Sequence, residues 1–248
     1  MDKKRFGLIG RNISYSFSRN YFNDKFKTLN LKDHEYVNYD LEDINDLRNE
    51  LQRDQAILRG LNVTIPYKEE IIPFLDEIDA EALNIGAVNT IKILPGNKLK
   101  GYNTDAYGFE KALKSIWRGS EKRALILGTG GASKAIAHVL HKTGIEFLYV
   151  SRKKGNDFTI TYDDLDMDII TAHELIINCS PVGTFPNVED CPKLPYEYLT
   201  EKHLLFDLIY NPEKTTFMKM GEKAGSLVIN GYSMLVYQAE KAWEIWNS

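Results

Sequence analysis

The sequence has few cysteines, no long apolar run and no marked excess of charge of either sign. Its 248 residues include two cysteines, Cys179 and Cys191, which are too few for a disulfide framework. No segment approaches the roughly 20 apolar residues of a membrane-spanning helix, and the charged N-terminal stretch MDKKRFGLIG lacks the apolar core of a signal peptide. We therefore expect a cytoplasmic protein without a membrane partner.

The charge balance and the histidines argue against two further kinds of protein. The chain carries 31 basic and 35 acidic residues, a net charge of −4, which gives no electrostatic reason to expect a nucleic-acid partner. His138 and His141 lie one helical turn apart, but no cysteine or acidic cluster completes a ligand set, so we predict no metal. A hydrophobic content of 43% indicates an ordinary globular protein.

Residues 123–154 are the most informative segment, because they predict one βαβ unit that binds a dinucleotide. An apolar strand at 124–127 is followed by Gly128, Gly130 and Gly131 at a turn. Such a turn lets the backbone approach a pyrophosphate and points free helix N–H groups at the anion. Ser133 stands where the usual fingerprint has its third Gly or Ala. The helix face that follows consists of Ala132, Ala135, Ile136, Val139 and Leu140.

The second strand of this unit, residues 147–150, is followed by cations. An NAD site places an acid about twenty residues after the glycines, where it accepts from the ribose 2′-OH. This chain has Ser151, Arg152 and Lys153 there, and Lys154 follows. Arg offers a planar fork to phosphate oxygens and Lys adds a point charge, so these residues favour a 2′-phosphate. We therefore predict NADP as the cofactor; without the glycine loop, a basic surface turn would be the simpler interpretation.

Strand-like and helix-like stretches alternate along the chain, which predicts an α/β fold. In the first hundred residues we expect strands at 6–9, 35–39, 58–63, 87–94 and 99–102, and helices at 19–29, 44–51 and from Lys68 onwards. A helix at 105–117 then leads into the dinucleotide unit. Further strands at 175–178, 204–207 and 227–229 are expected to join its parallel sheet, before a last helix at 232–246.

We predict two domains from this order of elements. Residues 1–104 would form an α/β substrate-binding domain, and residues 105–230 a doubly wound NADP-binding domain. The C-terminal helix, within residues 231–248, carries an apolar face and would pack back on the first domain.

Polar side chains gather near the predicted strand ends, where open α/β sheets place ligand groups. Ser16 and Ser18 follow the first strand, and alternate residues of an extended segment point the same way. The other members of this group are Asn62, Thr64, Lys68, Asn89, Asn103, Thr104 and Asp105. Their hydroxyl and amide groups suit a polyhydroxylated small molecule, although the serines could equally be plain turn residues.

The motifs along the chain resemble those of the shikimate dehydrogenase family. They are GRNISYSFS from Gly10, NVTIPYK from Asn62, GAVNT from Gly86, GYNTD from Gly101, GTGGA from Gly128, NCSPVG from Asn178, DLIYNPEKT from Asp207 and NGYSMLVYQ from Asn230. They occur in family order across nearly the whole chain. The resemblance implies a substrate domain joined to a Rossmann-type domain, and reversible NADPH-dependent reduction of 3-dehydroshikimate to shikimate in aromatic amino-acid biosynthesis.

The resemblance also implies roles for individual residues. Lys68 and Asp105 would be the catalytic pair. Ser16 and Ser18 would hold the substrate carboxylate, with Asn62, Thr64, Asn89, Tyr210 and Gln238 around the rest of the substrate. Gly128, Gly130, Gly131 and Ala132 would wrap the pyrophosphate, with Ser151, Arg152 and Lys153 at the adenosine phosphate and Gly231 near the nicotinamide.

The chemistry of alcohol oxidation supports the catalytic pair independently. As hydride leaves the alcohol carbon, the hydroxyl proton must pass to a nearby base. Lys68 could take that proton, and Asp105 could orient the amine, although a nearby anion would raise the pKa of a lysine. Which residue moves the proton stays open. Taken alone, a lysine in the place of Lys68 is usually a solvated residue without a catalytic role. An aspartate in the place of Asp105 is usually a helix N-cap.

Several departures and alternatives remain at this point. The family usually has Pro, His and Pro where this chain has Asn12, Tyr15 and Arg19, and Gly where it has Ser233. Ser233 and its neighbour Tyr232 could reshape the nicotinamide end. The alternatives are a quinate/shikimate dehydrogenase, a non-catalytic NADP-binding sensor and, less favoured, a methyltransferase of similar fold. Both carboxylate-binding serines are present, which favours shikimate. The sequence leaves monomer and homodimer open.

Overall fold

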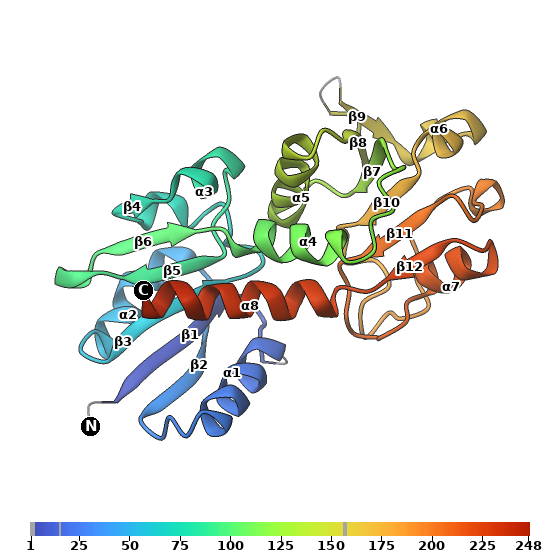
Figure 1. Cartoon of the computed structure of the whole chain (residues 1–248). Coiled ribbons are helices and arrows are strands. Elements are labelled where there is room, and N and C mark those ends of the chain that lie inside the picture. The colour runs from blue at the N-terminus through green and yellow to red at the C-terminus, as the bar shows by residue number, and fades with distance from the viewer. Residues whose placement is uncertain (1–2, 15, 156–157) are drawn as a thin grey trace. The chain divides into compact units, whose positions relative to one another are not determined.

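The computed structural model describes residues 3–14, 16–155 and 158–248. Its contacts divide the chain into two units, Met1–Thr104 with Ala239–Ser248, and Asp105–Gln238. Figure 1 labels their helices and strands. Residues 231–238, which we expected in the first domain, fall in the second unit. The functional assignment of the two domains stays a prediction.

The first unit is built on a six-stranded mixed sheet with the order β2-β1-β3-β5-β6-β4. Strands β2, β1 and β3 are parallel, and β5 is antiparallel to both of its neighbours. The carboxyl ends of β1 and β3 therefore lie at the same edge as the start of β5. The strands are β1 (Lys4–Gly10), β2 (His34–Asp40), β3 (Leu58–Val63), β4 (Glu77–Ile78), β5 (Thr90–Ile93) and β6 (Leu99–Tyr102).

Helices cover both faces of this sheet. They are α1 (Phe17–Thr28), α2 (Leu47–Asp54), α3 (Ala80–Ile85) and the end of α8 (Tyr232–Asn247), with short 3₁₀ turns at Ile44–Asp46, Ile72–Phe74 and Pro95–Asn97. The helix predicted from Lys68 onwards is wrong: the chain forms turns there and then the 3₁₀ turn at Ile72–Phe74. Pro73 explains the difference, since proline provides no N–H for an α-helical hydrogen bond.

Alternation along β1 separates two apolar cores. Phe6 and Leu8 face a core that contains Phe22 and Phe26 of α1 together with Ala239, Ala242 and Trp246 of α8. Ile9 faces the opposite core, which is closed by Leu47 and Leu51 of α2. The indole N–H of Trp246 donates to the carbonyl of Ile91 at 3.0 Å. The predicted packing of the C-terminal helix on the first domain is confirmed.

The second unit contains a six-stranded, entirely parallel sheet with the order β12-β11-β10-β7-β8-β9. In chain order this is the 3-2-1-4-5-6 arrangement of a Rossmann fold, and the direction of winding reverses between β7 and β10. The predicted fold class is confirmed. The strands are β7 (Arg123–Leu127), β8 (Glu146–Ser151), β9 (Thr159–Thr161), β10 (Leu175–Asn178), β11 (Leu204–Asp207) and β12 (Leu227–Ile229).

Helices and 3₁₀ turns pack on this second sheet. They are α4 (Thr104–Lys114), α5 (Gly131–Lys142), α6 (Met167–Ala172), α7 (Thr216–Lys223) and 3₁₀ turns at Tyr162–Asp164 and Tyr196–Tyr198. Phe109 of α4 packs on Phe206 of β11 with ring centroids 5.0 Å apart. Strand β9 and helices α6 and α7 were not predicted, because each is too short for its apolar residues to show a clear period.

Candidate functional site

The loop after β1 is held in place by one carboxylate. Asp40, at the end of β2, accepts from the backbone N–H groups of Asn12 at 2.7 Å and Ile13 at 3.1 Å. Asn12 has a left-handed φ of 56°, which proline cannot adopt. Asparagine at this departure from the family motif therefore fits the local backbone, whereas Tyr15 lies outside the described residues.

The two serines after this loop sit at the start of a helix. Ser16 is the N-cap of α1, and Ser18 lies in its first turn. The expectation of an extended segment is therefore wrong, because the chain turns into α1 directly after Ser16. The Ser16 hydroxyl makes no capping bond to the backbone of α1, and both serines are only half-buried.

A buried hydrogen-bond network joins the strand ends of the first unit. The Tyr36 hydroxyl of β2 donates to Oδ1 of Asn62 in β3 at 2.8 Å, and Asn62 Nδ2 donates to Oγ1 of Thr90 at 3.2 Å. Oδ1 of Asn89 accepts from the N–H of Thr104 at 2.7 Å and from the Thr90 hydroxyl at 3.1 Å. All five side chains are less than 9% exposed. Two of the predicted residues, Asn62 and Asn89, are therefore brought together.

Lys68 and Thr64 lie on the segment that follows β3. The N–H of Val88 donates to the carbonyl of Lys68 at 2.7 Å, which ties this segment to the one before β5. Gly86 ends α3 with a left-handed φ of 72°, a conformation that favours glycine, and thereby turns the chain toward Asn89. Both Lys68 and Thr64 are half-buried.

Asp105 opens the second unit in the first turn of α4. Its side chain is buried, and a carboxylate in a first helical turn is stabilised by the positive end of the helix dipole. The preceding residue, Thr104, is anchored to Asn89 of the first unit's network. The chain therefore leaves that network directly at Asp105.

The glycine turn after β7 lies where the winding of the second sheet reverses. Gly128 has a left-handed φ of 107°, so other residues would be strained there. Gly130 is the N-cap of α5, and a Cβ on it would meet no atom within 4 Å. The Ser133 hydroxyl donates back to the Gly130 carbonyl at 2.7 Å. The turn thus presents open space in front of free helix N–H groups, with Gly131 and Ala132 as the first residues of α5.

The basic residues follow β8, the strand next to β7. Ser151 ends β8, and Arg152 and Lys153 are exposed. The N–H of Lys153 donates to the Ser151 hydroxyl at 3.4 Å. Burial raises the pKa of Tyr162, and the positive charge of Arg152 nearby opposes that shift.

A buried aspartate organises the turns after β10 and β11. Asp207 is fully buried and accepts from Nδ2 of Asn178 at 3.0 Å, from the N–H of Ile209 at 3.1 Å and from the Thr215 hydroxyl at 2.6 Å. Burial raises the pKa of Asp207 to about 6, against the opposing effect of these three donors. Tyr210 follows in the turn that Asp207 holds.

Gly231, which follows β12, packs directly on that turn. Its N–H donates to the carbonyl of Ile209 at 3.0 Å, and a Cβ at this position would lie 2.1 Å from the Leu208 carbonyl oxygen. Gly231 therefore has a structural reason to be glycine. The strand order places Ser151, Gly128, the 208–210 turn and Gly231 in a row along one edge, about 19 Å from β8 to β12 at a strand spacing of about 4.8 Å.

The first turns of α8 carry the remaining predicted residues. Gln238 is buried, and its Nε2 donates to the carbonyl of Leu235 at 3.0 Å. The Ser233 Oγ is buried and has no hydrogen-bond partner within the described residues, while Tyr232 is 51% exposed.

Two other features were sought in the described part of the chain. Within residues 3–14, 16–155 and 158–248, no group of three or more His, Cys, Asp or Glu side chains is arranged to hold a metal ion. None of the helices in the same ranges combines the length and the hydropathy that crossing a bilayer requires.

Comparison with known proteins identifies the family. A family model described as the shikimate dehydrogenase substrate binding domain matches residues 8–91. The shikimate dehydrogenase (NADP(+)) of Halothermothrix orenii is 38% identical over 262 residues, which cover 97% of this chain and 89% of that protein. The chain belongs to the shikimate dehydrogenase family. The family prediction is confirmed.

Solved shikimate dehydrogenase structures match the chain over nearly its full length. One, in complex with NADP⁺, is 37% identical with a TM-score of 0.84, covering 98% of this chain and 90% of that one. Another, from Thermus thermophilus in complex with NADP(H) and shikimate, is 31% identical with a TM-score of 0.84, covering 98% and 93%.

In this member of the shikimate dehydrogenase family, three buried hydrogen-bonding residues were not found from the sequence, two in the network of the first unit and one in the second unit. Tyr36 and Thr90 were not singled out, and Asp207 was noted only as the start of a motif. Tyr36 lies in a strand where an aromatic residue is ordinary core, so no sequence signal distinguished it. Thr90 and Asp207 are polar residues next to apolar strands, and that position was the available signal.

Proposed function

We propose that this chain is an NADP-dependent shikimate dehydrogenase that reversibly reduces 3-dehydroshikimate to shikimate. The observation that carries the proposal is near full-length identity of 38% to a relative named shikimate dehydrogenase (NADP(+)). The buried polar network at the strand ends of the first unit supports it, because it includes two of the residues expected to bind substrate. The enzyme would act in the shikimate pathway of aromatic amino-acid biosynthesis.

Most of the residues proposed to bind the substrate belong to the first unit. Ser16 and Ser18 would bind the carboxylate at the start of α1, and Asn62, Thr64 and Asn89 would address the hydroxyl groups. Tyr210 and Gln238 would contribute from the second unit. A small polyhydroxylated acid needs several such groups. Each polar atom of the ligand loses its hydrogen bonds to water on binding, and a protein side chain must replace them.

The residues proposed to bind the cofactor belong to the second unit, and they fit a phosphorylated dinucleotide. Gly128, Gly130, Gly131 and Ala132 would receive the pyrophosphate at the start of α5, where a Cβ on Gly130 would meet open space and the first turn holds no acid. Ser151, Arg152 and Lys153 would bind the 2′-phosphate. Gly231 would lie at the nicotinamide end of the row of strands. When bound, NADP⁺ supplies the acceptor for the hydride of the substrate alcohol.

Lys68 and Asp105 are the proposed catalytic pair. In the direction of shikimate oxidation, one of them takes the hydroxyl proton as the carbonyl forms, and Lys68 as the ammonium stabilises the developing negative charge. In the direction of reduction, the same proton returns to the alkoxide oxygen. We assign the proton transfer to Lys68 as the hypothesis to test.

The same proposal covers cellular context and partners. We place the enzyme in the cytoplasm as a monomer or homodimer, with a small-molecule substrate and no nucleic-acid or membrane partner. The net charge of −4 supports the part of this placement that concerns nucleic acid, because a polyanion would meet a protein of the same sign.

One assay tests substrate class, cofactor and activity together. Shikimate and quinate are each offered with NADP⁺ and with NAD⁺, and the absorbance of the reduced nicotinamide is followed. We expect turnover with shikimate and NADP⁺ at the highest kcat/KM of the four combinations. Higher efficiency with quinate would support the quinate/shikimate alternative, and tight NADPH binding without turnover would support a non-catalytic sensor.

A further inference from the structure

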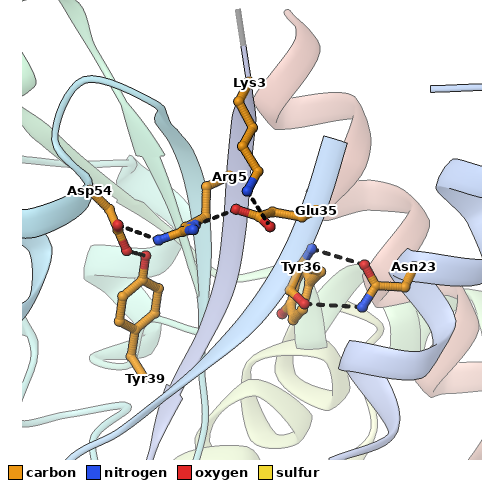
Figure 2. Close-up of polar contacts among 7 residues, drawn as sticks. All are labelled: Lys3, Arg5, Asn23, Glu35, Tyr36, Tyr39 and Asp54. Atoms are coloured by element: carbon orange, nitrogen blue, oxygen red, sulfur yellow. Dashed lines mark hydrogen bonds and ion pairs between the residues drawn. The ribbon is translucent and has the colours of Figure 1, made fainter. Parts of the chain in front are cut away.

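Tyr36 lies buried between two of the residues proposed to bind substrate. It is 2% exposed, and its ring stacks on Phe22 with centroids 4.7 Å apart and planes 9° apart. Figure 2 shows that Asn23 of α1 brackets its backbone, with bonds of 3.0 Å to both the N–H and the carbonyl. Both the backbone and the ring of Tyr36 are therefore fixed, so its hydroxyl occupies a defined position.

The orientation of the Asn62 amide follows from its partners. One end lies 3.3 Å from the carbonyl oxygen of Asn89, which can only accept, so that end must be the NH₂ group. The other end is then Oδ1, which can only accept, and it faces the Tyr36 hydroxyl at 2.8 Å. Because the NH₂ group already has Asn89 and Thr90 as acceptors, the group left for a ligand is the second lone pair of Oδ1.

The Tyr36 hydroxyl has a single proton and must therefore donate it to Oδ1 of Asn62. Its oxygen then only accepts, and Ser18 is the hydrogen-bond partner that lowers the pKa of Tyr36 against the strong upward effect of burial. The net pKa lies well above that of an ordinary tyrosine, so the hydroxyl stays a donor throughout the working pH range. The Tyr36 hydroxyl is therefore the donor to Asn62.

We propose that Tyr36 is a positioning residue that commits Asn62 to accept a hydrogen bond from a ligand hydroxyl. The inference rests on the proposed function and deepens it. A hydroxyl that becomes a carbonyl during the reaction could not keep donating, and its oxygen would then face Oδ1 without a proton between them. Asn62 therefore recognises a hydroxyl that remains a hydroxyl in both substrate and product, and thereby helps to decide which alcohol is oxidised.

Tyr39 provides a matched control on the same strand. It lies three residues further along β2 and belongs to the opposite core. Its hydroxyl donates to Oδ2 of Asp54 at 2.6 Å, beside the ion pairs that Arg5 makes with Asp54 and Glu35 (Figure 2). Tyr39→Phe thus removes a comparable half-buried hydrogen bond without touching Asn62 or Ser18.

The test measures selectivity for a donating hydroxyl. The wild type, Tyr36→Phe and Tyr39→Phe are assayed with shikimate and with its two analogues in which one non-reacting hydroxyl is replaced by fluorine. Fluorine has nearly the size of a hydroxyl but cannot donate. The ratio of kcat/KM for shikimate to that for each analogue is compared between variants, so that the electronic effect of fluorine on the reaction cancels.

In the wild type we expect the ratio for one analogue to be about thirtyfold, which is the loss when a buried acceptor is left unpaired. In Tyr36→Phe the Asn62 amide loses the donor to Oδ1 and is held only by the 3.3 Å contact to Asn89 and by Thr90, whose hydroxyl can also donate to a turned amide. Its NH₂ group can then turn to the fluorine, and the ratio falls about tenfold. In Tyr39→Phe it stays as in the wild type. An unchanged ratio in Tyr36→Phe, or no discrimination against either analogue by the wild type, would overturn the inference.

Two further readouts keep the result interpretable. If Tyr36→Phe does not fold, Asn23→Ala replaces it, since it removes the two bonds that fix the backbone of Tyr36 and so loosens the position of its hydroxyl. A smaller fall in the ratio, about threefold, is then expected, and an unchanged ratio counts against the inference. Failure of the proposed function looks different, because the wild type itself would then not reduce NADP⁺ with shikimate.

Discussion

The two units present their candidate ligand groups in different ways. In the first unit, Asn62 and Asn89 are oriented by buried side-chain hydrogen bonds. In the second unit, Gly128, Gly130 and Gly231 shape the backbone itself. The polarity of a side chain can distinguish one hydroxyl from another, whereas backbone N–H groups at a helix start suit any phosphate. Selectivity for the substrate is therefore expected in the first unit, and affinity for the cofactor phosphates in the second.

The largest expected effect is that of Lys68→Ala. Loss of a general acid and base lowers kcat by about a thousandfold, within the usual range for such groups. Initial rates over a range of pH measure it, with Lys100→Ala, which loses an ion pair to Glu77 and a cation–π contact with Tyr102, as the control. If Lys68→Ala keeps the basic limb of the wild-type pH profile, Lys68 does not transfer the proton.

Asp207 in the second unit is a case in which a side chain holds the backbone. Its pKa is raised to about 6 in the folded protein, so the folded state binds the proton more tightly than the unfolded state. Stability from this group is complete below the unfolded pKa, near 4, and is lost as pH rises through about 6, by about 3 kcal/mol in all.

Asp207→Asn stays neutral at every pH and isolates that effect. Relative to the variant, the wild type should lose stability between pH 4 and 6 and change little above that range. Urea unfolding of both proteins at several pH values measures the difference. A difference that is constant with pH would show that Asp207 stays ionised in the folded protein.

Arg152→Ala tests the one side chain on which the choice between cofactors chiefly depends. A hydrogen bond to a charged group contributes about 2 kcal/mol, so the preference for NADPH over NADH should fall about thirtyfold. Dissociation constants for both cofactors measure it. Arg123→Ala, at the other end of β7 and paired with Glu146, is the control and should leave the preference unchanged.

Gly130→Ala separates backbone shape from stability. Its φ of −79° suits alanine and a Cβ would meet no protein atom, so the melting temperature should not fall. The methyl group would occupy space proposed for the pyrophosphate and weaken NADPH binding about tenfold, roughly 1.4 kcal/mol. Gly128→Ala, with its left-handed φ, should lose stability as well. Unchanged NADPH affinity in Gly130→Ala would contradict the cofactor site.

The smallest expected difference is between the two serines. The Ser16 hydroxyl makes no capping bond, whereas the Ser18 side chain lies near enough to Tyr36 to lower its pKa, so a carboxylate would have to compete with Tyr36 for the Ser18 hydroxyl. We expect Ser16→Ala to raise the KM for shikimate about tenfold and Ser18→Ala about threefold. The exposed Ser14 serves as the control. Equal effects would show that Tyr36 does not compete for the Ser18 proton.

Much of the fold was predictable, because its signals are local. The apolar runs at Leu58–Val63, Leu175–Asn178, Leu204–Asp207 and Leu227–Ile229 became strands with the expected bounds. The region after Lys68 was not predicted correctly, since Pro73 outweighed the helical pattern around it. Ser16 and Ser18 were expected on an extended segment and lie at the start of α1.

The site was predictable only in part. Motif residues such as Asn62 and Asn89 were found from the sequence, but their roles stay predictions. The groups that orient them were not found, because Tyr36 in β2 reaches Asn62 in β3 across the intervening strand β1. A contact between residues 26 positions apart depends on strand order, which a single sequence leaves open.

The end of α8 has a consequence for how the protein is made. Trp246 packs on Phe6 and Phe22 with ring centroids about 5 Å away, and it fills the space above Gly60 that a side chain would need. During translation, the core built from residues 1–104 is therefore not closed until residues 239–246 have also been made. The segment 105–238 emerges earlier, holds its own sheet, and is expected to fold first on the ribosome.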